Sequence, residues 1–253
     1  MCNIIRVMML SLIVAILSGC SHTVNKILSP PADTKWVNVE IKNPSQYTEP
    51  LSLLVRYISY ECPKKRVSGF DGSVITEPSY NPIRIPMQQQ SGDIWRAKVP
   101  MTGGGSCKWA LSAVKLSIHY IDTTHLGKDL VSGTAVGAII AFDNDASQNG
   151  QFDIVSSNNT TFSPVFYPLI KIDKRNGEYD ELSLFGKDDF LQKKIIGISD
   201  SITIMFNPIL DESKIVKRIA PSEYKVGVFP KIVYPDGTIL SGGAIRPDIR
   251  MVK

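Results

Sequence analysis

Alternation of apolar and polar side chains is the feature of this sequence that most restricts its fold. It is clearest in residues 114–120, where every second side chain is apolar. One face of the extended segment is therefore apolar and the other polar, with Val114, Leu116, Ile118 and Tyr120 on the first and Lys115, Ser117 and His119 on the second. Because successive side chains of a β-strand point to opposite sides, this pattern predicts a strand with one face in the core.

Similar short stretches recur along the chain, separated by Gly, Pro, Asn and Asp. They predict β-strands at residues 36–42, 51–61, 83–88, 94–99, 108–121, 136–142, 162–173, 201–207, 225–234 and 238–244. Turns of the hairpin kind are expected at Ser91-Gly92-Asp93, Gly103-Gly104-Gly105-Ser106 and Pro235-Asp236-Gly237. Weak helical character is confined to residues 188–194 and 213–219.

Many short strands with few helices predict an all-β fold of the antiparallel β-sandwich type. The polar stretch at residues 143–153 is the best candidate for a domain boundary. We therefore expect two tandem sandwich-like domains, at residues 36–150 and 151–253. An apolar content of 43% is ordinary for a globular core, so folding should need no cofactor.

The front of the chain has the composition of a secretory signal peptide. Arg6 precedes an apolar stretch at residues 7–17, which is shorter than the roughly 20 apolar residues of a membrane-spanning helix. The sequence Leu17-Ser18-Gly19-Cys20 that follows resembles the lipobox of bacterial lipoproteins. The resemblance implies that residues 1–19 are removed and that Cys20 carries a diacylglycerol thioether. The alternative is an ordinary cysteine after an ordinary signal peptide.

A lipidated Cys20 would make the membrane a partner of the protein through its N-terminus, since several acyl chains on one residue anchor a protein stably. Residues 20–35 are polar, contain Pro30-Pro31 and are expected to form a tether. In enteric-type bacteria, retention in the inner membrane usually requires Asp after the lipidated cysteine, whereas Ser21 stands here. The implied location is the outer membrane, facing the periplasm.

Cysteine usage fits an exported protein. If the lipobox resemblance holds, Cys2 leaves with the leader and Cys20 is lipidated, so that Cys62 and Cys107 remain as a pair. Because the periplasm is oxidising, a Cys62–Cys107 disulfide is expected. Two free buried thiols are the alternative.

The charge balance argues against a nucleic-acid partner. Removal of the leader takes away Arg6 alone, which leaves 27 of the 28 basic residues against 24 acidic ones, a net charge of +3. Nucleic-acid binders usually show a concentrated basic face. The largest basic cluster here is Lys64-Lys65-Arg66, which is expected to form a solvated turn.

The sequence carries no recognisable catalytic motif. It lacks a G-x-S-x-G elbow, an H-E-x-x-H helix, a C-x-x-C pair and a phosphate loop, so we expect no enzymatic activity and no catalytic residue. His119 and His125 with Asp122 could in principle bind a metal or relay protons. Surface or hydrogen-bonded histidines are the favoured interpretation, because a metal site usually needs further ligands at a fixed spacing.

Two loops have compositions that resemble ion-binding loops. Oxygen-bearing side chains at alternate positions of residues 143–153 are of the type that calcium prefers, but Gln148 and Ile154 stand where an EF-hand needs Gly and Glu. A solvated loop is therefore favoured. The Gly103-Gly104-Gly105 run could form an anion-binding nest, and a flexible hairpin explains it equally well. No metal or cofactor site is predicted.

Tyrosine and tryptophan side chains near strand ends are candidate interface residues, although such residues are also common in the core and rim of a sandwich. They are Tyr57, Tyr60, Tyr80, Trp95, Tyr167 and Tyr234. Core or rim positions are the favoured interpretation of these residues. The lack of catalytic motifs, the disulfide-stapled sandwich and the near-neutral surface favour a binding module that captures or blocks a protein in the periplasm. An envelope structural or assembly lipoprotein is the alternative, and a hydrolase with an unrecognised site is the third class.

The overall build of the chain, a lipobox leader before a disulfide-bearing β domain, resembles the immunity lipoproteins that protect bacteria from phospholipase effectors delivered by type VI secretion. This resemblance implies that the protein would bind a secreted toxic effector and occlude its active site. No functional residue is carried over from it.

The substitution Cys62→Ala should lower the free energy of unfolding without preventing lipidation. A loop of about 45 residues closed by a disulfide contributes roughly 4 kcal/mol in the chain-entropy model. Thermal or denaturant unfolding under oxidising conditions would measure the loss. Equal stability of the variant and the parent would show that the disulfide is absent.

Overall fold

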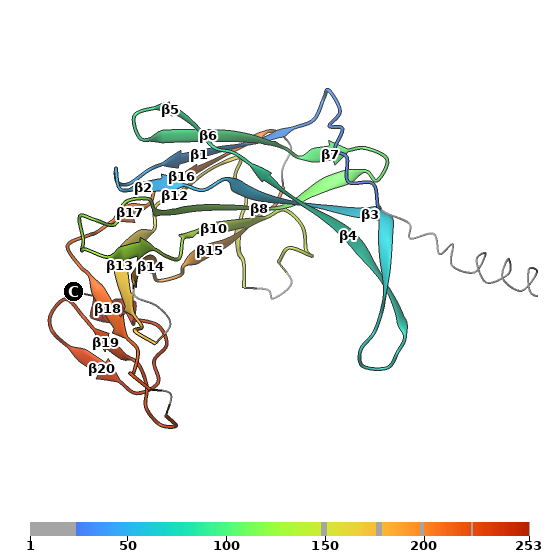
Figure 1. Cartoon of the computed structure of the whole chain (residues 1–253). Helices are drawn as coiled ribbons and strands as arrows, with labels where there is room; N and C mark the ends of the chain where they lie inside the picture. Colours follow the sequence, from blue (N-terminus) through green and yellow to red (C-terminus); the bar gives the residue numbers. More distant parts are fainter. Residues whose placement is uncertain (1–23, 148–150, 176–178, 198–199, 224, 253) are drawn as a thin grey trace, which may run out of the picture.

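A computed structural model of the chain describes residues 24–147, 151–175, 179–197, 200–223 and 225–252. Strands and one 3₁₀ turn, Ile249–Met251, make up its regular structure (Figure 1). The all-β prediction is confirmed for these residues. The expected signal peptide and Cys20 lie outside them. Within the described ranges, no helix has the length and apolar character needed to cross a membrane.

The strands form three sheets, named here sheets 1, 2 and 3. Sheet 1 has the order β12 (Asn159–Phe162), β16 (Ile202–Phe206), β1 (Trp36–Lys42), β6 (Ile94–Pro100) and β5 (Gln88–Ser91). Sheet 2 has the order β11 (Asp153–Val155), β15 (Phe190–Ile195), β10 (Val136–Ala141), β8 (Trp109–Tyr120), β3 (Leu53–Val67) and β4 (Val74–Ile85), with β2 (Thr48–Pro50) and β7 (Thr102–Gly104) also paired to β8. Sheet 3 has the order β20 (Ile239–Ser241), β19 (Lys231–Val233), β18 (Val216–Ile219), β13 (Val165–Ile172), β14 (Asp180–Gly186) and β9 (Leu130–Ser132), with β17 (Ile209–Leu210) paired to β13.

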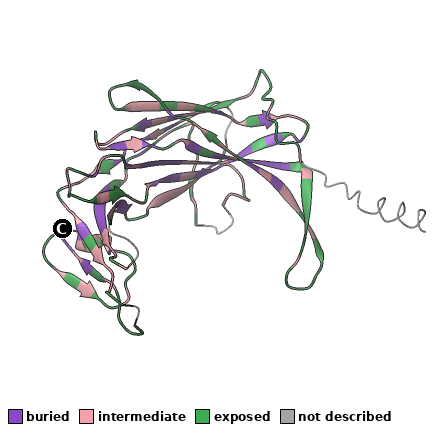
Figure 2. Ribbon diagram, viewed as in Figure 1, coloured by how far each residue is buried: buried purple, intermediate pink, exposed green. Residues whose placement is uncertain are grey.

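Sheets 1 and 2 share one apolar core, which makes the fold sandwich-like (Figure 2). In β1, Val37, Val39 and Ile41 are completely or almost completely buried, while the residues between them are more exposed. The alternation predicted for residues 114–120 is confirmed, because all four of its apolar side chains are buried in the same core. Burying one large aliphatic side chain contributes about 1.5–3 kcal/mol, so these rows are a major source of stability.

Sheet 3 extends the sandwich at one end. Its strands β13 and β14 contribute Phe166, Ile170, Leu182 and Leu184 to the main core. Their other side chains join a second, smaller cluster with β18 and β19, made up of Leu169, Phe185, Val216, Ile232, Tyr234 and Val252. The hairpin β13–β14 therefore connects the sandwich to the C-terminal strands.

The expected division into domains 36–150 and 151–253 is not confirmed. Strand β1 pairs in parallel with β16, and β10 pairs in parallel with β15, so that both sheets of the sandwich contain strands from either side of residue 150. Phe206 and Val37 also belong to the same core cluster. A cut at residue 150 would divide both sheets and this core.

Strand direction and two weakly helical segments differ from the sequence-based expectations. The sheets are mixed, because β16, β15 and several shorter strands pair in parallel with their neighbours. Residues 188–194 contribute to β15 and residues 213–219 to β18, so the helical interpretation of both segments is wrong. Each strand completes a sheet beside an already buried partner, and such tertiary pairing overrides weak helical propensity.

All three of the expected hairpin turns connect paired strands. The Gly103-Gly104-Gly105-Ser106 run ends β7 and begins the turn to its partner β8. Ser91-Gly92-Asp93 joins β5 to β6, and Pro235-Asp236-Gly237 joins β19 to β20. In the last of these turns, the Tyr234 amide donates to the Thr238 carbonyl oxygen at 2.9 Å. The turn sequences were informative because they lie between strands that are adjacent along the chain.

Residues 24–150 expressed alone should not fold cooperatively. Without residues 151–253, β1 loses β16 and β10 loses β15, so buried backbone edges and apolar side chains become exposed. We expect a broad thermal transition by circular dichroism and a poorly dispersed amide NMR spectrum. The mature full-length chain, which should unfold in one sharp transition, is the control. A sharp transition of the fragment would contradict a core shared by both halves.

Candidate functional site

The predicted Cys62–Cys107 disulfide is present and joins strand β3 to the turn that precedes β8. Cys107 is buried, and its carbonyl oxygen accepts a hydrogen bond from the Ser59 hydroxyl. The Cys62 amide in turn donates to the Ser59 oxygen at 3.1 Å. These contacts lie where the register between β3 and β4 shifts, just after Ser59. The disulfide therefore fixes the point at which the β3–β4 hairpin leaves the sandwich.

Beyond this point the hairpin projects into solvent, and we call residues 60–80 the arm (Figure 1). Within it, pairs such as Lys64 with Glu77 and Val67 with Val74 hold β3 and β4 together. The apolar side chains near its end are exposed, with 67% of Val67, 99% of Phe70 and 65% of Val74 accessible to solvent. An isolated two-stranded ribbon is only marginally stable in water, so the arm depends on the covalent fastening at its base.

The turn at the end of the arm is closed by its own hydrogen bonds. The Ser68 amide donates to the Ser73 carbonyl oxygen at 2.8 Å, and the Gly72 amide donates to the Ser68 carbonyl oxygen at 3.1 Å. The amide and hydroxyl of Ser73 both donate to one carboxylate oxygen of Asp71. Hydrogen bonds from the Ser68 and Ser73 side chains hold the pKa of Asp71 below its usual value. The hydrogen bonds that close this turn therefore do not involve the Phe70 side chain.

Charged and aromatic contacts support the sides of the arm. Lys64 and Arg66 contact the Glu77 carboxylate at 3.1 and 3.0 Å, and their hydrogen bonds lower its pKa. The Tyr60 hydroxyl donates to Asp145, and this hydrogen bond is the main reason that the pKa of Tyr60 rises to about 12. Exposed ion pairs contribute little each, about 0–1 kcal/mol. The cluster Lys64-Lys65-Arg66 thus lies on a solvated strand, where a turn was expected.

Residues 25–31, which we call the docked segment, lie against the body of the protein. The Trp109 indole N–H donates to the Asn25 carbonyl oxygen at 3.0 Å, and the Asn81 amide group donates to the Lys26 carbonyl oxygen at 2.8 Å. The Ser29 amide donates to the Gly103 carbonyl oxygen at 2.8 Å. This part of the expected tether is therefore anchored, and it passes the base of the arm.

The triglycine run makes room for the docked segment. A Cβ atom on Gly104 would lie 2.2 Å from the Ser29 carbonyl oxygen, and one on Gly105 would lie 2.6 Å from the Ile27 carbonyl oxygen. Gly104 and Gly105 also have positive φ angles of 61° and 72°. These glycines are explained by close backbone approach, and neither a flexible hairpin nor an anion-binding nest is needed to account for them.

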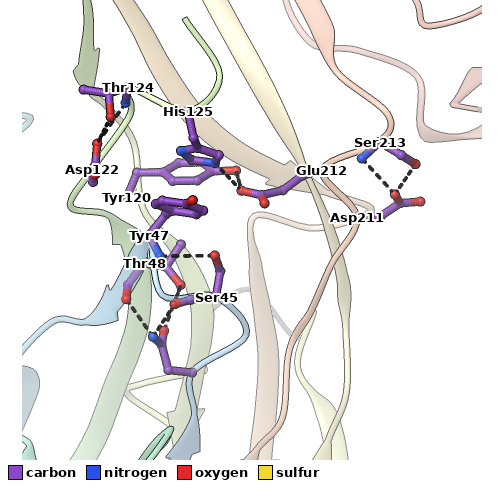
Figure 3. Close-up of polar contacts among 11 residues, drawn as sticks. Ser45, Tyr47, Thr48, Tyr120, Asp122, Thr124, His125, Asp211, Glu212 and Ser213 are labelled. Atoms are coloured by element: carbon purple, nitrogen blue, oxygen red, sulfur yellow. Dashed lines mark hydrogen bonds and ion pairs between the residues drawn. The ribbon is translucent and has the colours of Figure 1, made fainter.

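Of the two strand-associated histidines, His125 lies in a compact cluster that the sequence did not reveal (Figure 3). Its Nε2 atom lies 2.9 Å from Oε1 of Glu212, which also accepts a hydrogen bond of 2.9 Å from the Tyr120 hydroxyl. The Tyr47 ring stacks on the imidazole, with 3.6 Å between the ring centroids. Glu212 lies 87 positions from His125 in the sequence, so no local pattern could have indicated it.

The possible metal or proton-relay group of His119, His125 and Asp122 is not assembled, and both histidines contact polar side chains, as the favoured interpretation has it. His119 contacts Ser132 and lies 3.8 Å from Glu49, whereas Asp122 accepts hydrogen bonds from Thr124 in its own turn. Within the described ranges, no three His, Cys, Asp or Glu residues are grouped so that they could hold a metal ion.

The His125 cluster connects separate parts of the fold. Tyr120 ends β8 in sheet 2, whereas Glu212 lies between β17 and β18 of sheet 3. Burial is the main cause of the raised pKa of Tyr120, and its proximity to Glu212 adds to the shift. Because one carboxylate oxygen accepts from both side chains, the geometry fits a structural bridge between the two sheets.

The possible calcium loop lies partly outside the described residues, at positions 148–150. Among the carboxylates that are described, Asp143 accepts from the Ala146 amide, Asp145 from Tyr60 and Asp153 from Lys193. Each carboxylate has a different partner. This arrangement favours the solvated-loop interpretation of residues 143–147.

The six candidate aromatic residues have different environments. Tyr57 and Tyr234 are buried in the two cores, while Tyr80, Trp95 and Tyr167 are half-buried. Tyr60 is exposed on the arm. Phe70, which is the most exposed aromatic residue of the described ranges at 99%, was not among them, because a single phenylalanine in a Gly-rich turn has no distinctive sequence pattern.

No protein-family model matches the chain, and neither does any curated protein or solved structure. Candidates for an interaction site are therefore the exposed apolar residues that contribute nothing to the packing of the fold. The docked segment and the His125 cluster both serve packing. Among the described residues, the tip of the arm is the strongest candidate for an interaction site.

The substitution Gly104→Ala should release the docked segment, because the new Cβ atom would clash with the Ser29 carbonyl oxygen. We expect hydrogen exchange at the Ser29 amide to accelerate by about tenfold or more, as for loss of one hydrogen bond. Gly72→Ala is a matched control, because Gly72 also has a positive φ angle and its Cβ would meet nothing within 4 Å. Equal exchange at Ser29 in both variants would contradict this role of Gly104.

Proposed function

We propose that the protein is a lipid-anchored, periplasm-facing module of the outer membrane that binds another protein. The observation that carries this proposal is the arm, which projects from a disulfide-fastened base and exposes Phe70 almost completely. Exposed apolar side chains on a projecting element contribute nothing to the core of the fold. Aromatic side chains are enriched among the residues that dominate protein interfaces.

The lipid anchor is proposed from the lipobox resemblance at Cys20. Three residues lie between Cys20 and Val24, so that a lipidated Cys20 would be within four chain steps, about 14 Å, of the first described residue. The docked segment follows directly, and its Lys26 carbonyl oxygen is bonded to Asn81 beside the arm. The lipid anchor and the arm would therefore extend from the same end of the protein.

A more specific form of the proposal is an immunity protein that binds and inhibits a toxic effector such as a phospholipase. Support comes from the resemblance in build to immunity lipoproteins and from the shape of the arm, since a narrow projecting hairpin suits occlusion of a cleft. In this role, the protein would act by covering the active site of the effector.

The second candidate is an assembly or structural lipoprotein of a cell-envelope or secretion complex. It is favoured by further exposed apolar side chains in and around sheet 3, at the opposite end from the arm (Figure 1), namely Val226, Phe229, Ile239 and Ile245. Two separate apolar surfaces would allow a scaffold to contact two neighbours.

The full-length tagged protein, extracted with detergent from the membrane fraction, would test the proposal by copurification. Recovery of one toxic enzyme would support immunity, and recovery of several envelope proteins would support assembly. Absence of any stable partner would contradict both. For immunity, unchanged survival of a deletion strain beside a toxin-delivering sibling strain would also contradict the proposal.

The substitution Cys20→Ser should move the protein from the membrane fraction to the soluble periplasmic fraction, because it removes the thiol that is alkylated. Labelled palmitate should be incorporated into the parent and not into the variant. The variant Cys62→Ala is the control, because it also loses one thiol and should keep its label. A parent protein without label would contradict lipidation.

A further inference from the structure

The tip of the arm has the properties of a preformed binding element. Its turn is closed by hydrogen bonds among Ser68, Asp71, Gly72 and Ser73, and none of these bonds involves the Phe70 side chain. A binding loop that is already ordered loses less conformational entropy when it binds. A buried phenylalanine removes roughly 150–250 Å² from water, so one such side chain can anchor an interface.

Pairing of a partner strand to the sides of the arm is disfavoured. Pro63 in β3 and Pro78 in β4 lack the amide hydrogen that an added strand would need. Prolines and charged residues on edge strands are typical devices against such pairing. Recognition is thus expected to use side chains at the tip.

The charges of the arm favour a protein over a lipid surface. Asp71 is adjacent to Phe70, and its lowered pKa means that it stays ionised at neutral pH. Behind it, Lys64, Arg66 and Glu77 carry both signs of charge along the ribbon. Ionised groups enter hydrocarbon only at a high free-energy cost, whereas a protein can offer a partner for each of them.

We infer that the arm inserts its tip into a concave site of a folded protein partner, with Phe70 in an apolar pocket and Asp71 beside a lysine or arginine at the rim of that pocket. From Cys62 to Val67, strand β3 can reach roughly 16 Å at about 3.3 Å per residue, and the turn with Phe70 lies beyond it, enough to enter a cleft. This inference rests on the proposed function as a protein-binding module, and it assigns the binding to one surface.

A photoreactive phenylalanine analogue placed at position 70 of the full-length lipoprotein would test the inference in living cells. We expect a covalent adduct with a single protein, and no such adduct when the analogue replaces Ile154. Ile154 is a matched control because it is 66% exposed and lies on β11, at the edge of sheet 2 opposite β4. The adduct should contain the same protein that copurifies with the parent.

Substitutions at the tip provide the second measurement. Phe70→Ser should reduce recovery of that protein by tenfold or more, and Asp71→Asn should reduce it several-fold, with a weaker salt dependence than the parent. Ile154→Ser should leave recovery unchanged. All three positions are exposed, so the variants should keep the thermal midpoint of the parent, which excludes misfolding as the cause.

The outcomes separate the inference from the proposed function. If the copurified protein is recovered equally with Phe70→Ser, or if position 70 forms an adduct with lipid or no adduct at all, the inference is overturned while the proposed function stands. If the parent itself recovers no protein, the proposed function fails and the inference fails with it.

Discussion

Two parallel strand pairings, β1 with β16 and β10 with β15, are the interactions on which the rest of the structure depends. The first brings the beginning of the described chain into register with residues more than 150 positions later, for example Val37 beside Ile202. The second brings Gly137 beside Phe190, across the segment that leads from one half of the chain to the other. Each pairing adds a late strand to a sheet begun by early ones, and the shared core forms between the completed sheets. Contacts so distant in sequence close large loops, so folding is expected to be slow for a chain of this length.

The sequence was informative where structure is decided locally. Strand β1 was expected at residues 36–42 and has those bounds, and the alternating stretch in β8 faces the core as expected. Turn residues between neighbouring strands identified three hairpins, β5–β6, β7–β8 and β19–β20. The pairings of β15 and β18 could not be predicted, because their neighbours are chosen by tertiary contact, and parallel partners share no turn that would indicate them.

In the candidate sites too, features decided by local sequence could be predicted, and features decided by tertiary contacts could not. The disulfide could be expected from the number of cysteines and the proposed oxidising compartment, since no distance information is needed if the lipobox resemblance leaves two thiols. Glu212 could not be connected to His125, because only the fold brings them together. The role of the triglycine run was also hidden, because the residues that require its small size, Ile27 and Ser29, lie far upstream. The arm was partly anticipated as a solvated basic cluster, but its extension as a ribbon depends on the β4 strand opposite.

Because the disulfide lies at the base of the arm, the arm becomes fixed only when this bond has formed. Below the Cys62–Cys107 bond the strands are packed in sheet 2, and above it they pair only with each other. A disulfide of this kind forms in an oxidising compartment and not in the reducing cytosol. If the protein is exported as proposed, the newly made chain would lack a fixed arm until it reaches the oxidising compartment. Disulfide formation would then set when the arm becomes ordered, and binding through its tip would begin only after export.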